Sequence, residues 1–386
     1  MSTILEKIET YKSELESWFE HMHRNPELSM QEAETASYIA DVLRPWGYEV
    51  VSGVGKHGIV ASLTVGNGTK AIGLRADFDA LPIQEINDLA YKSDKEGISH
   101  LCGHDGHTTM LLAAGKYLAE TKNFNGTVRL IFQPGEETME GGPAMIKDGL
   151  FERFPIDAVF GMHNMPGLEL GKFYFADGEV MAAVDNWEIE IIGKGSHGSM
   201  PELGIDPIVA GASLVMALQT IVSRNVAPAN SAVVTVGAFI SGSAGNVVAQ
   251  SAVLRLSIRT KTPQDRKMVL DQVRKLTKNQ TEGFGCTYEI REGVPGAVLV
   301  NDETETQKAC EIAKNTFGEE NVIYPGPTFL GSEDFAFMLQ QKPGTYCFVG
   351  NGNTPMVHHP EYVFNRKNLT KGAAYWVALT QGYLKD

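Results

Sequence analysis

One stretch in the middle of the chain constrains its fold more than any other. Between about Val184 and Pro295, the apolar pattern predicts the order strand, helix, strand, strand, helix, strand. This order is that of the split βαβ, or ferredoxin-like, unit, which is complete in itself. We therefore expect an inserted domain over residues 184–297, and a discontinuous outer domain formed by residues 1–183 and 298–386.

The length and the flanking pattern agree with two domains. The chain has 386 residues, whereas single hydrophobic cores stop growing at about 250–300 residues. In the outer part, strands alternate with helices, which predicts an α/β fold with a largely parallel sheet covered on both faces. Apolar residues from Ile4 to Met22 predict one helix, and Ser29 with Glu32 predicts a capping box at the start of the next.

The composition narrows the class of protein. A formal net charge of −14 argues against nucleic acid as a partner, because phosphate binding requires a basic surface. No apolar run of about 18 residues appears, so no membrane partner is expected. The N-terminus lacks the apolar core of a signal peptide, and the four cysteines lie far apart. These features predict a cytoplasmic protein with reduced thiols.

Four clusters of potential metal ligands fall at separate places in the outer domain. Three of them come directly after predicted strands, and ligands in open α/β sheets bind beyond the carboxyl ends of strands. The clusters are therefore expected to meet in one crevice. They are Cys102-Gly-His104-Asp105-Gly-His107, Glu136-Glu137, His163-Asn164 and His358-His359.

Each cluster alone has an ordinary explanation. A lone loop histidine usually makes a hydrogen bond or faces solvent, a Glu-Glu pair is usually solvated, and a free cysteine usually packs as a small hydrophobe. Five of the ten histidines lie in these clusters, however. The joint pattern, with its repeated position at strand ends, favours a metal site.

The donor types indicate a hydrolytic metal centre. A thiolate, imidazoles and carboxylates suit zinc or a neighbouring first-row metal. Two ions about 3.5–4 Å apart hold a shared water and lower its pKa. A nearby carboxylate that binds no metal takes the proton from this water, and adjacent glutamates provide one ligand and one base. The chain has no H-E-x-x-H helix, deaminase P-C-x-x-C pair, nucleophile elbow or phosphate loop.

Six sequence runs, spread in order over nearly the whole chain, resemble one family. It is the aminoacylase and carboxypeptidase family of co-catalytic metallohydrolases, and the subgroup is that of hippurate hydrolases and indole-acetyl-amino-acid hydrolases. The resemblance implies a zinc-exopeptidase type (phosphorylase/hydrolase-like) catalytic domain with a mixed sheet, plus an inserted α+β ferredoxin-like lid. The runs are Arg75–Pro82, Cys102–Thr108, Phe132–Glu137, Gly161–Pro166, Gly331–Phe335 and His358–Pro360.

The resemblance also implies roles for individual residues of the clusters. Glu136 falls at the position of the general base, although the swapped assignment of Glu136 and Glu137 stays open. His359 is the alternative to His358. Asp77, Asp79, Asp105 and His107 resemble residues that orient the ligands, with helix capping or loop hydrogen bonding as the alternative. The implied metal ligands are Cys102, His104, Glu137, His163 and His358.

The inserted domain carries a second set of implied residues. His197 resembles a lid histidine that donates a hydrogen bond to the oxyanion. Asn246 and Arg259 fall at positions that hold the carboxylate of the substrate, although Arg259 at a strand end has solvation as its alternative. The chain departs from the family pattern at Pro201-Glu202 and at Asn246–Ala249, which bears on substrate preference.

The resemblance implies a metal-dependent amidohydrolase that cleaves N-acyl-amino acids of the hippurate, N-acetyl or indole-acetyl type. Two divalent ions per subunit are expected, zinc or manganese first, with cobalt, nickel and iron as alternatives. A homodimer or higher homo-oligomer formed through the lid is also expected. The competing interpretations are a dipeptidase or carboxypeptidase with the same machinery, and a metal-dependent binding protein without turnover.

Overall fold

The computed structural model of the protein describes residues 3–385 and divides into two compact units. The larger unit comprises the described residues through Val180, Val300–Thr328 and the residues from Asp334 onward. The inserted unit comprises Met181–Leu299 and Phe329–Glu333. The chain therefore passes between the units at four points.

The segment Phe329–Glu333 joins the inserted unit although it follows that unit by many residues in the sequence. The Ala182 N–H donates to the Gly331 carbonyl over 2.9 Å, and the Arg259 guanidinium donates to Ser332 Oγ over 3.1 Å. The expected boundaries assign this segment to the outer domain. The difference arises because contacts between distant residues, which the local pattern does not contain, decide its position.

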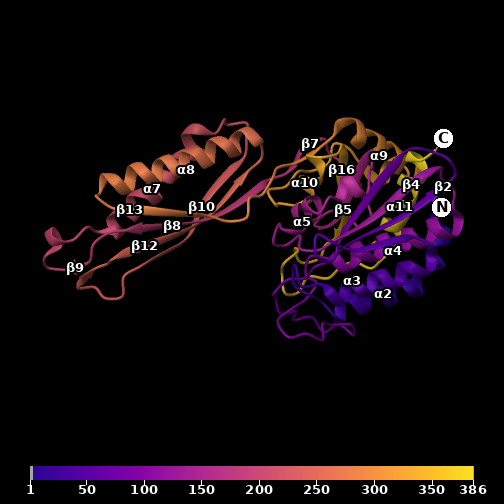
Figure 1. Ribbon diagram of the computed structural model, residues 1–386, viewed down its shortest axis with the longest axis horizontal. Coiled ribbons are helices and arrows are strands. Elements are labelled where there is room, and N and C mark those ends of the chain that lie inside the picture. The colour runs from indigo at the N-terminus through magenta and orange to yellow at the C-terminus, as the bar shows by residue number, and fades with distance from the viewer. Residues whose placement is uncertain (1–2, 386) are drawn as a thin grey trace. The chain divides into compact units, whose positions relative to one another are not determined.

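The larger unit is built on a mixed sheet of eight strands in the described part of the chain, shown in Figure 1. Four neighbouring strands, β4, β3, β5 and β16, are parallel, and the strands next to them on either side, β2 and β6, are antiparallel to them. The predicted α/β class with a mixed, largely parallel sheet is confirmed. In spatial order the strands are β1 (Glu49–Val54), β2 (Gly58–Val65), β4 (Gly126–Gln133), β3 (Ala71–Asp77), β5 (Ala158–Pro166), β16 (Gly344–Gly352), β6 (Phe173–Tyr174) and β15 (Val322–Ile323).

Helices cover both faces of this sheet. Successive strand residues point to opposite faces, and on β5 Met162 lies against Gly372 of α11, whereas Gly161 lies against Phe335 of α10. Apart from those near the N-terminus, the described part of this unit has six α-helices. They are α4 (His104–Thr121), α5 (Gly141–Lys147), α6 (Leu150–Arg153), α9 (Glu303–Phe317), α10 (Phe335–Leu339) and α11 (Lys367–Tyr383), with the short η1 (Arg44–Trp46) and η3 (Glu319–Asn321).

The N-terminal region differs from its prediction in two ways. The single helix expected from Ile4 to Met22 is two helices, α1 (Thr3–Glu9) and α2 (Lys12–Arg24), although its apolar face is buried as expected. The next helix, α3, spans Ala33–Leu43, and the side chain of its N-cap residue Glu32 makes no capping bond, whereas Glu27 Oε2 accepts from the Thr35 N–H over 2.8 Å. The capping box predicted at Ser29 and Glu32 is therefore wrong.

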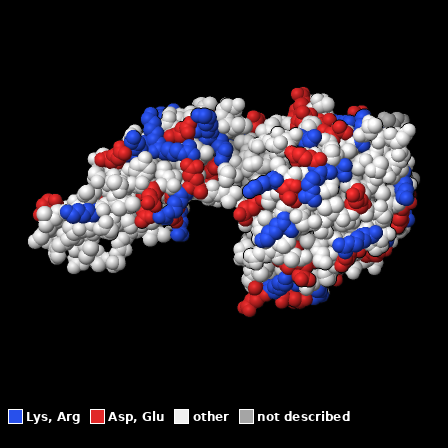
Figure 2. Space-filling model, in the orientation of Figure 1, with Lys and Arg blue, Asp and Glu red and all other residues white. Residues whose placement is uncertain are grey.

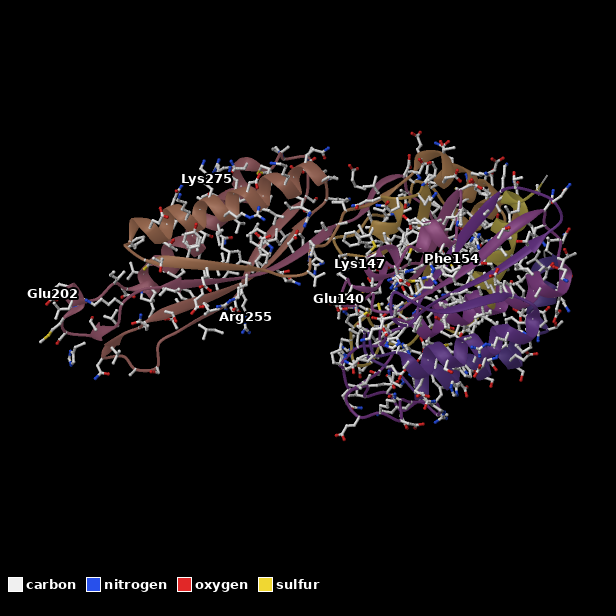
Figure 3. All side chains as sticks on the ribbon, in the orientation of Figure 1. Glu140, Lys147, Phe154, Glu202, Arg255 and Lys275 are labelled. Atoms are coloured by element: carbon white, nitrogen blue, oxygen red, sulfur yellow. The ribbon has the colours of Figure 1, made fainter. Side chains whose placement is uncertain are left out.

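The inserted unit is built on a four-stranded antiparallel sheet in the spatial order β10, β12, β8, β13. Two helices, α7 and α8, pack on one face, and in Figure 3 Arg255 of β12 points away from the sheet on the opposite face to Lys275 of α8. The element order is the predicted ferredoxin-like one. The elements are β8 (Ala183–Ile192), α7 (Pro207–Asn225), β10 (Ala232–Ser241), β12 (Ser251–Thr260), α8 (Pro263–Gly283) and β13 (Thr287–Glu292).

Short elements complete the chain. A small sheet pairs β9 (Ser196–His197) with β11 (Val247–Val248), and η2 covers Pro201–Leu203. A second small sheet pairs β7 (Gly178–Met181) with β14 (Leu299–Asn301). Among the described residues, α7 is the one helix that is long and apolar enough to cross a membrane by length and composition, and 33% of that window is buried within the protein.

A buried ion pair joins α2 to the first turn of α4. His23 Nδ1 lies 2.7 Å from Asp105 Oδ2, and His23 Nε2 lies 3.3 Å from both carboxylate oxygens of Glu85. Burial lowers the pKa of His23, but the hydrogen bonds to Asp105 and Glu85 outweigh this effect and raise it to about 9. His23 is therefore a cation in the folded protein at neutral pH.

We expect this pair to make stability depend on pH. Because the folded-state pKa is raised, the stabilisation is present below about pH 6.5 and is lost as the pH rises through about 9, which amounts to roughly 3 kcal/mol. Urea unfolding of the metal-free protein at pH 7 and pH 10 measures the loss. The His23→Gln variant should show a smaller decrease, and equal decreases in both proteins would contradict the assignment.

Candidate metal centre

The first-turn residues of α4 and the loop before it carry two donor atoms. Gly103 adopts a φ of 95°, and a β-carbon there would approach Asn164 Nδ2 to 2.4 Å, so only glycine fits. The apolar pattern predicts a helix from about His107 to Leu118, but the helix begins at His104, three residues earlier. Cys102 and His104 are both buried, and the Cys102 carbonyl accepts a hydrogen bond from Asn164 Nδ2 over 2.7 Å.

The parallel strands bring the other clusters to the same place, as the sequence analysis expects. Cys102 Sγ lies 3.3 Å from His163 Nε2, and His358 Nε2 lies 3.3 Å from Glu137 Oε2. His104 Nε2 lies 3.9 Å from Glu136 Oε2 and 3.9 Å from Glu137 Oε1. Two donors bound tetrahedrally to one ion lie about 3.4 Å apart, so these spacings suit shared metal ions.

The same atoms form three overlapping groups, and every donor within a group lies within 4.8 Å of the others. Because the groups share members, they can hold more than one ion side by side. Glu137 belongs to two of them. The groups are Cys102, His104 and His163; Cys102, Glu137 and His358; and His104, Glu136 and Glu137.

Neighbouring carboxylates and carbonyls orient the two buried histidines. His104 Nδ1 lies 3.0 Å from the Asp79 carbonyl and 3.1 Å from Asp79 Oδ1, and His163 Nδ1 contacts the Asn164 carbonyl. In each ring the Nδ1–H is the donor, which leaves Nε2 as the electron-pair donor. His104 Nε2 and Glu137 Oε1 are buried and have no hydrogen-bond partner among residues 3–385.

His107 and Asp105 are engaged in hydrogen bonds to other residues of the protein. His107 Nδ1 lies 2.7 Å from Asp77 Oδ1, and its Nε2 accepts the Asn164 N–H over 3.1 Å, so both ring nitrogens of His107 are used within the protein. Asp105 bonds to His23 and to the Gly106 N–H, which makes it a residue of the helix start. Asp77 contacts His107 and Asp79 contacts His104, which agrees with the predicted role of orienting histidines rather than with helix capping or loop hydrogen bonding.

Negative charge dominates the site. Burial raises the pKa of the Cys102 thiol far above its usual range, and the charges of Glu137, Glu136 and Asp77 raise it further. Burial alone would lower the pKa of His104, but Asp77 and Asp79 raise it to about 10. Divalent cations would compensate this charge, so the donor set fits metal ions.

The inserted unit brings two of its predicted residues together and keeps the third apart. His197 pairs with Val247 across the β9–β11 sheet, next to Asn246, and both His197 and Asn246 are exposed. Arg259 lies at the other end of β12 from Ser251, roughly 26 Å away at 3.3 Å per residue. His197 lies beyond the Ser251 end, so the structure does not bring Arg259 together with His197 within one inserted unit.

Comparisons with known proteins agree with a metal site of this kind. The family described as Peptidase family M20/M25/M40 matches residues 73–382. A hippurate hydrolase of Campylobacter jejuni is 45% identical over 99% of this chain and 100% of its own length. An N-acetyl-L-cysteine deacetylase of Bacillus subtilis is 38% identical over 92% and 84%. The crystal structure of a dinuclear metal-binding M20 peptidase from Bacillus subtilis matches with a TM-score of 0.84 at 31% identity, covering 97% of this chain and 99% of the other.

The two adjacent histidines allow a direct test of the ligand set. His358 has a φ of 68°, and its N–H donates to the Leu101 carbonyl over 2.7 Å, whereas His359 Nδ1 lies 4.0 Å from Glu361. We expect His358→Ala to weaken Mn²⁺ binding by at least about tenfold, and the matched control His359→Ala to leave it unchanged. Competition with a chelator measures both. The reverse order of effects would assign the ligand to His359.

Proposed function

Because the chain belongs to the peptidase family M20/M25/M40 and is a hydrolase of amide bonds, we propose that it cleaves the acyl group from small N-acyl-amino acids. The family predicted from the sequence runs is thereby confirmed. The observation that carries the proposal is the convergence of donors from four separate strand ends and loops, with Glu136 beside them. The similarity to a hippurate hydrolase over the whole chain supports the substrate class.

The proposed metal ligands are Cys102, His104, Glu137, His163 and His358. Two divalent ions held there would supply a water of lowered pKa and positive charge for the carbonyl oxygen of the substrate. One thiolate among imidazoles and carboxylates suits zinc or manganese, with cobalt, nickel and iron as alternatives. The 3.3 Å separation of Glu137 from His358 supports Glu137 rather than Glu136 as the ligand.

Glu136 is the proposed general base. Its side chain is buried, and Oε2 lies 3.9 Å from His104 Nε2, at the edge of the donor groups. The carboxylate takes a proton from the attacking water, whose oxygen forms the new bond to the acyl carbon. Glu136 then delivers that proton to the nitrogen as the C–N bond breaks. The products are a carboxylic acid and a free amino acid.

Three residues of the inserted unit complete the proposal. His197 Nδ1 accepts hydrogen bonds from the Ser199 N–H over 3.1 Å and from Ser199 Oγ over 2.8 Å, so Nε2 carries the proton and can donate to an oxyanion. Arg259 and Asn246 are the proposed partners of the substrate carboxylate. Arg259 and His197 lie too far apart in one unit for a single small substrate, which supports a site that uses residues of two copies of the chain.

The inserted unit also has a surface suited to a second copy. The sheet ends at β10, whose outer edge is unpaired in the described part of the chain. Next to it, Met216 of α7 is 71% exposed and Ile240 of β10 is 54% exposed. In Figure 2 the Lys and Arg side chains of this unit gather over α8 instead. A homodimer that pairs two β10 edges and covers α7 would bury these side chains.

The other inferences concern partners and location. Neither nucleic acid nor a membrane is a proposed partner, given the net charge of −14 and given that the one span-like helix of residues 3–385, α7, belongs to the inserted unit. We infer a cytoplasmic enzyme. All four cysteines are free thiols in the described structure, as is usual in a reducing compartment.

The role of Glu136 can be tested separately from metal binding. We expect Glu136→Gln to lower kcat by roughly 10²–10⁴-fold, because the amide accepts no proton from water. Two ions per chain should remain bound, as measured by elemental analysis. The control is Glu140→Gln, in the same loop but exposed. Turnover close to that of the wild type would exclude Glu136 as the base.

The substrate class requires a panel of N-acetyl, N-benzoyl and indole-acetyl amino acids together with dipeptides. The expected result is release of free amino acid from the N-acyl compounds after chelation and resupply of metal. Faster cleavage of dipeptides would favour the dipeptidase or carboxypeptidase alternative. Metal binding without turnover on any substrate would favour a binding protein.

The proposed dimer buries the surface around Met216, so a charge introduced there should oppose association. We expect Met216→Glu to convert a dimer into a monomer in analytical ultracentrifugation and to lower activity, because a buried unpaired carboxylate opposes association and the monomer lacks the partner's contribution. Phe284→Glu, 43% exposed at the end of α8, is the matched control and should leave both properties unchanged. A wild-type protein that is fully active as a monomer would contradict the two-copy site.

A further inference from the structure

The end of α2 and the loop that leads to α3, residues 23–32, have polar contacts that neither the proposed chemistry nor helix capping uses. This segment contacts three separate parts of the larger unit. The first turn of α4 and the turn at Gly135 carry proposed donor atoms, and the third part, at Asp79, holds His104. The contacts are His23 to Asp105 over 2.7 Å, Ser29 Oγ to Asp79 Oδ2 over 2.7 Å, and the Gly135 N–H to Glu32 Oε1 over 2.8 Å.

The contact of Ser29 reaches two of the proposed ligands through one carboxylate. Asp79 Oδ2 accepts from Ser29 Oγ and also from the Glu137 N–H over 3.0 Å. The other oxygen of Asp79 lies 3.1 Å from His104 Nδ1. Asp79 is 1% exposed, so these donors replace solvent around it. Its position, and with it that of His104 and Glu137, depends in part on Ser29.

The contact of Glu32 holds the turn that carries the two glutamates. Glu32 is fully buried, and its Oε1 accepts hydrogen bonds from the Met30 N–H over 2.7 Å and from the Gly135 N–H over 2.8 Å. Its other oxygen is buried without a partner in the part of the chain that the structure describes. Burial, reinforced by the charge of Asp79, raises the pKa of Glu32 to about 7. Keeping such a group buried is costly, which argues for a specific task.

The backbone on both sides of this bond is strained or tightly packed. Met30 has a φ of 60°, which is unfavourable for a residue with a β-carbon. Gly135 has a φ of 61°, and a β-carbon on it would lie 2.6 Å from Met30 Sδ. The segment therefore presses directly against the turn from Gly135 to Glu137. A strained conformation of this kind persists only where the surroundings hold it, and Glu32 accepts from both residues.

We propose that residues 23–32 are a positioning segment of the metal centre, and that Glu32 sets the place of the Glu136–Glu137 pair through the Gly135 N–H. This inference rests on the proposed function, because it assumes that these glutamates serve metal ions and water. Glu32 touches neither substrate nor metal, so it is a positioning residue. Residues that orient ligands in this way change metal affinity or activity by 10–100-fold when they are replaced.

The test compares Glu32→Ala, Glu32→Gln and Ser29→Ala with the wild type. Glu34→Ala is the matched control, since Glu34 is exposed two residues further on. The measurements are Mn²⁺ affinity by chelator competition, the visible spectrum of the Co²⁺-loaded protein, the Tm of the metal-free protein, and kcat and KM at saturating metal. Metal affinity and the Co²⁺ spectrum report on ligand positions without relying on turnover.

We expect Glu32→Ala to weaken Mn²⁺ binding about 10–100-fold, to shift the Co²⁺ spectrum and to lower kcat more than it changes KM. Glu32→Gln keeps an oxygen for both N–H groups and should restore affinity to within a few-fold. Ser29→Ala should act in the same direction with a smaller effect. If Glu32→Ala does not fold, Glu32→Gln and Ser29→Ala decide by the same measurements.

Unchanged metal affinity and an unchanged Co²⁺ spectrum in Glu32→Ala, with only a lower Tm, would overturn the inference and leave a structural role. The proposed function fails in a different way. A wild-type protein that binds two ions but hydrolyses no member of the substrate panel would refute the proposed function, while the affinity comparison between variants would still decide the role of Glu32.

Discussion

The larger unit depends on one electrostatic constraint, the burial of several carboxylates at the ends of parallel strands. A buried carboxylate needs a cation or N–H donors, because it has lost its solvation by water. Arg75 lies 2.6 Å from Asp77 and 3.1 Å from Asp334 and supplies charge to both. The pair Glu136 and Glu137 has a different environment, beside imidazoles and a thiol. The proposed divalent ions would balance this remaining negative charge. Metal binding would therefore lower the same electrostatic cost of buried carboxylates that the ion pairs of Arg75 lower in the folded chain.

The position of the candidate metal centre could be predicted from the sequence because a parallel sheet imposes it. Glu136 and Glu137 follow β4 and His163 lies near the end of β5, so both clusters must reach the same edge, since parallel strands end on the same side. The ferredoxin-like order of the inserted unit could be predicted for a similar reason, because periodic apolar residues are a local signal. The start of α4 at His104 could not be predicted from the sequence, because the polar residues of its first turn show no apolar period. Gly103 permits the earlier start through its positive φ.

The residues missed by sequence analysis bond to partners far away in the chain. Ser29 and Glu32 have the spacing of a capping box, yet their side chains bond to Asp79 and Gly135, 50 and 103 residues away. Tyr362, which donates to Asn164 Oδ1 over 2.6 Å, likewise lies in an irregular segment with no motif. Local patterns contain helix and strand preferences, but they do not contain which loops meet. The unexpected grouping of residues 329–333 has the same origin.

That grouping has a mechanical consequence. Ser332, hydrogen-bonded to Arg259, belongs to the inserted unit, and Asp334, paired with Arg75, belongs to the larger one. Two residues of extended chain span at most about 7 Å. While both bonds hold, Ser332 is fixed within the inserted unit and Asp334 within the larger one, so Glu333 alone carries the change from one unit to the other. The length of this link is therefore constrained by bonds made inside each unit.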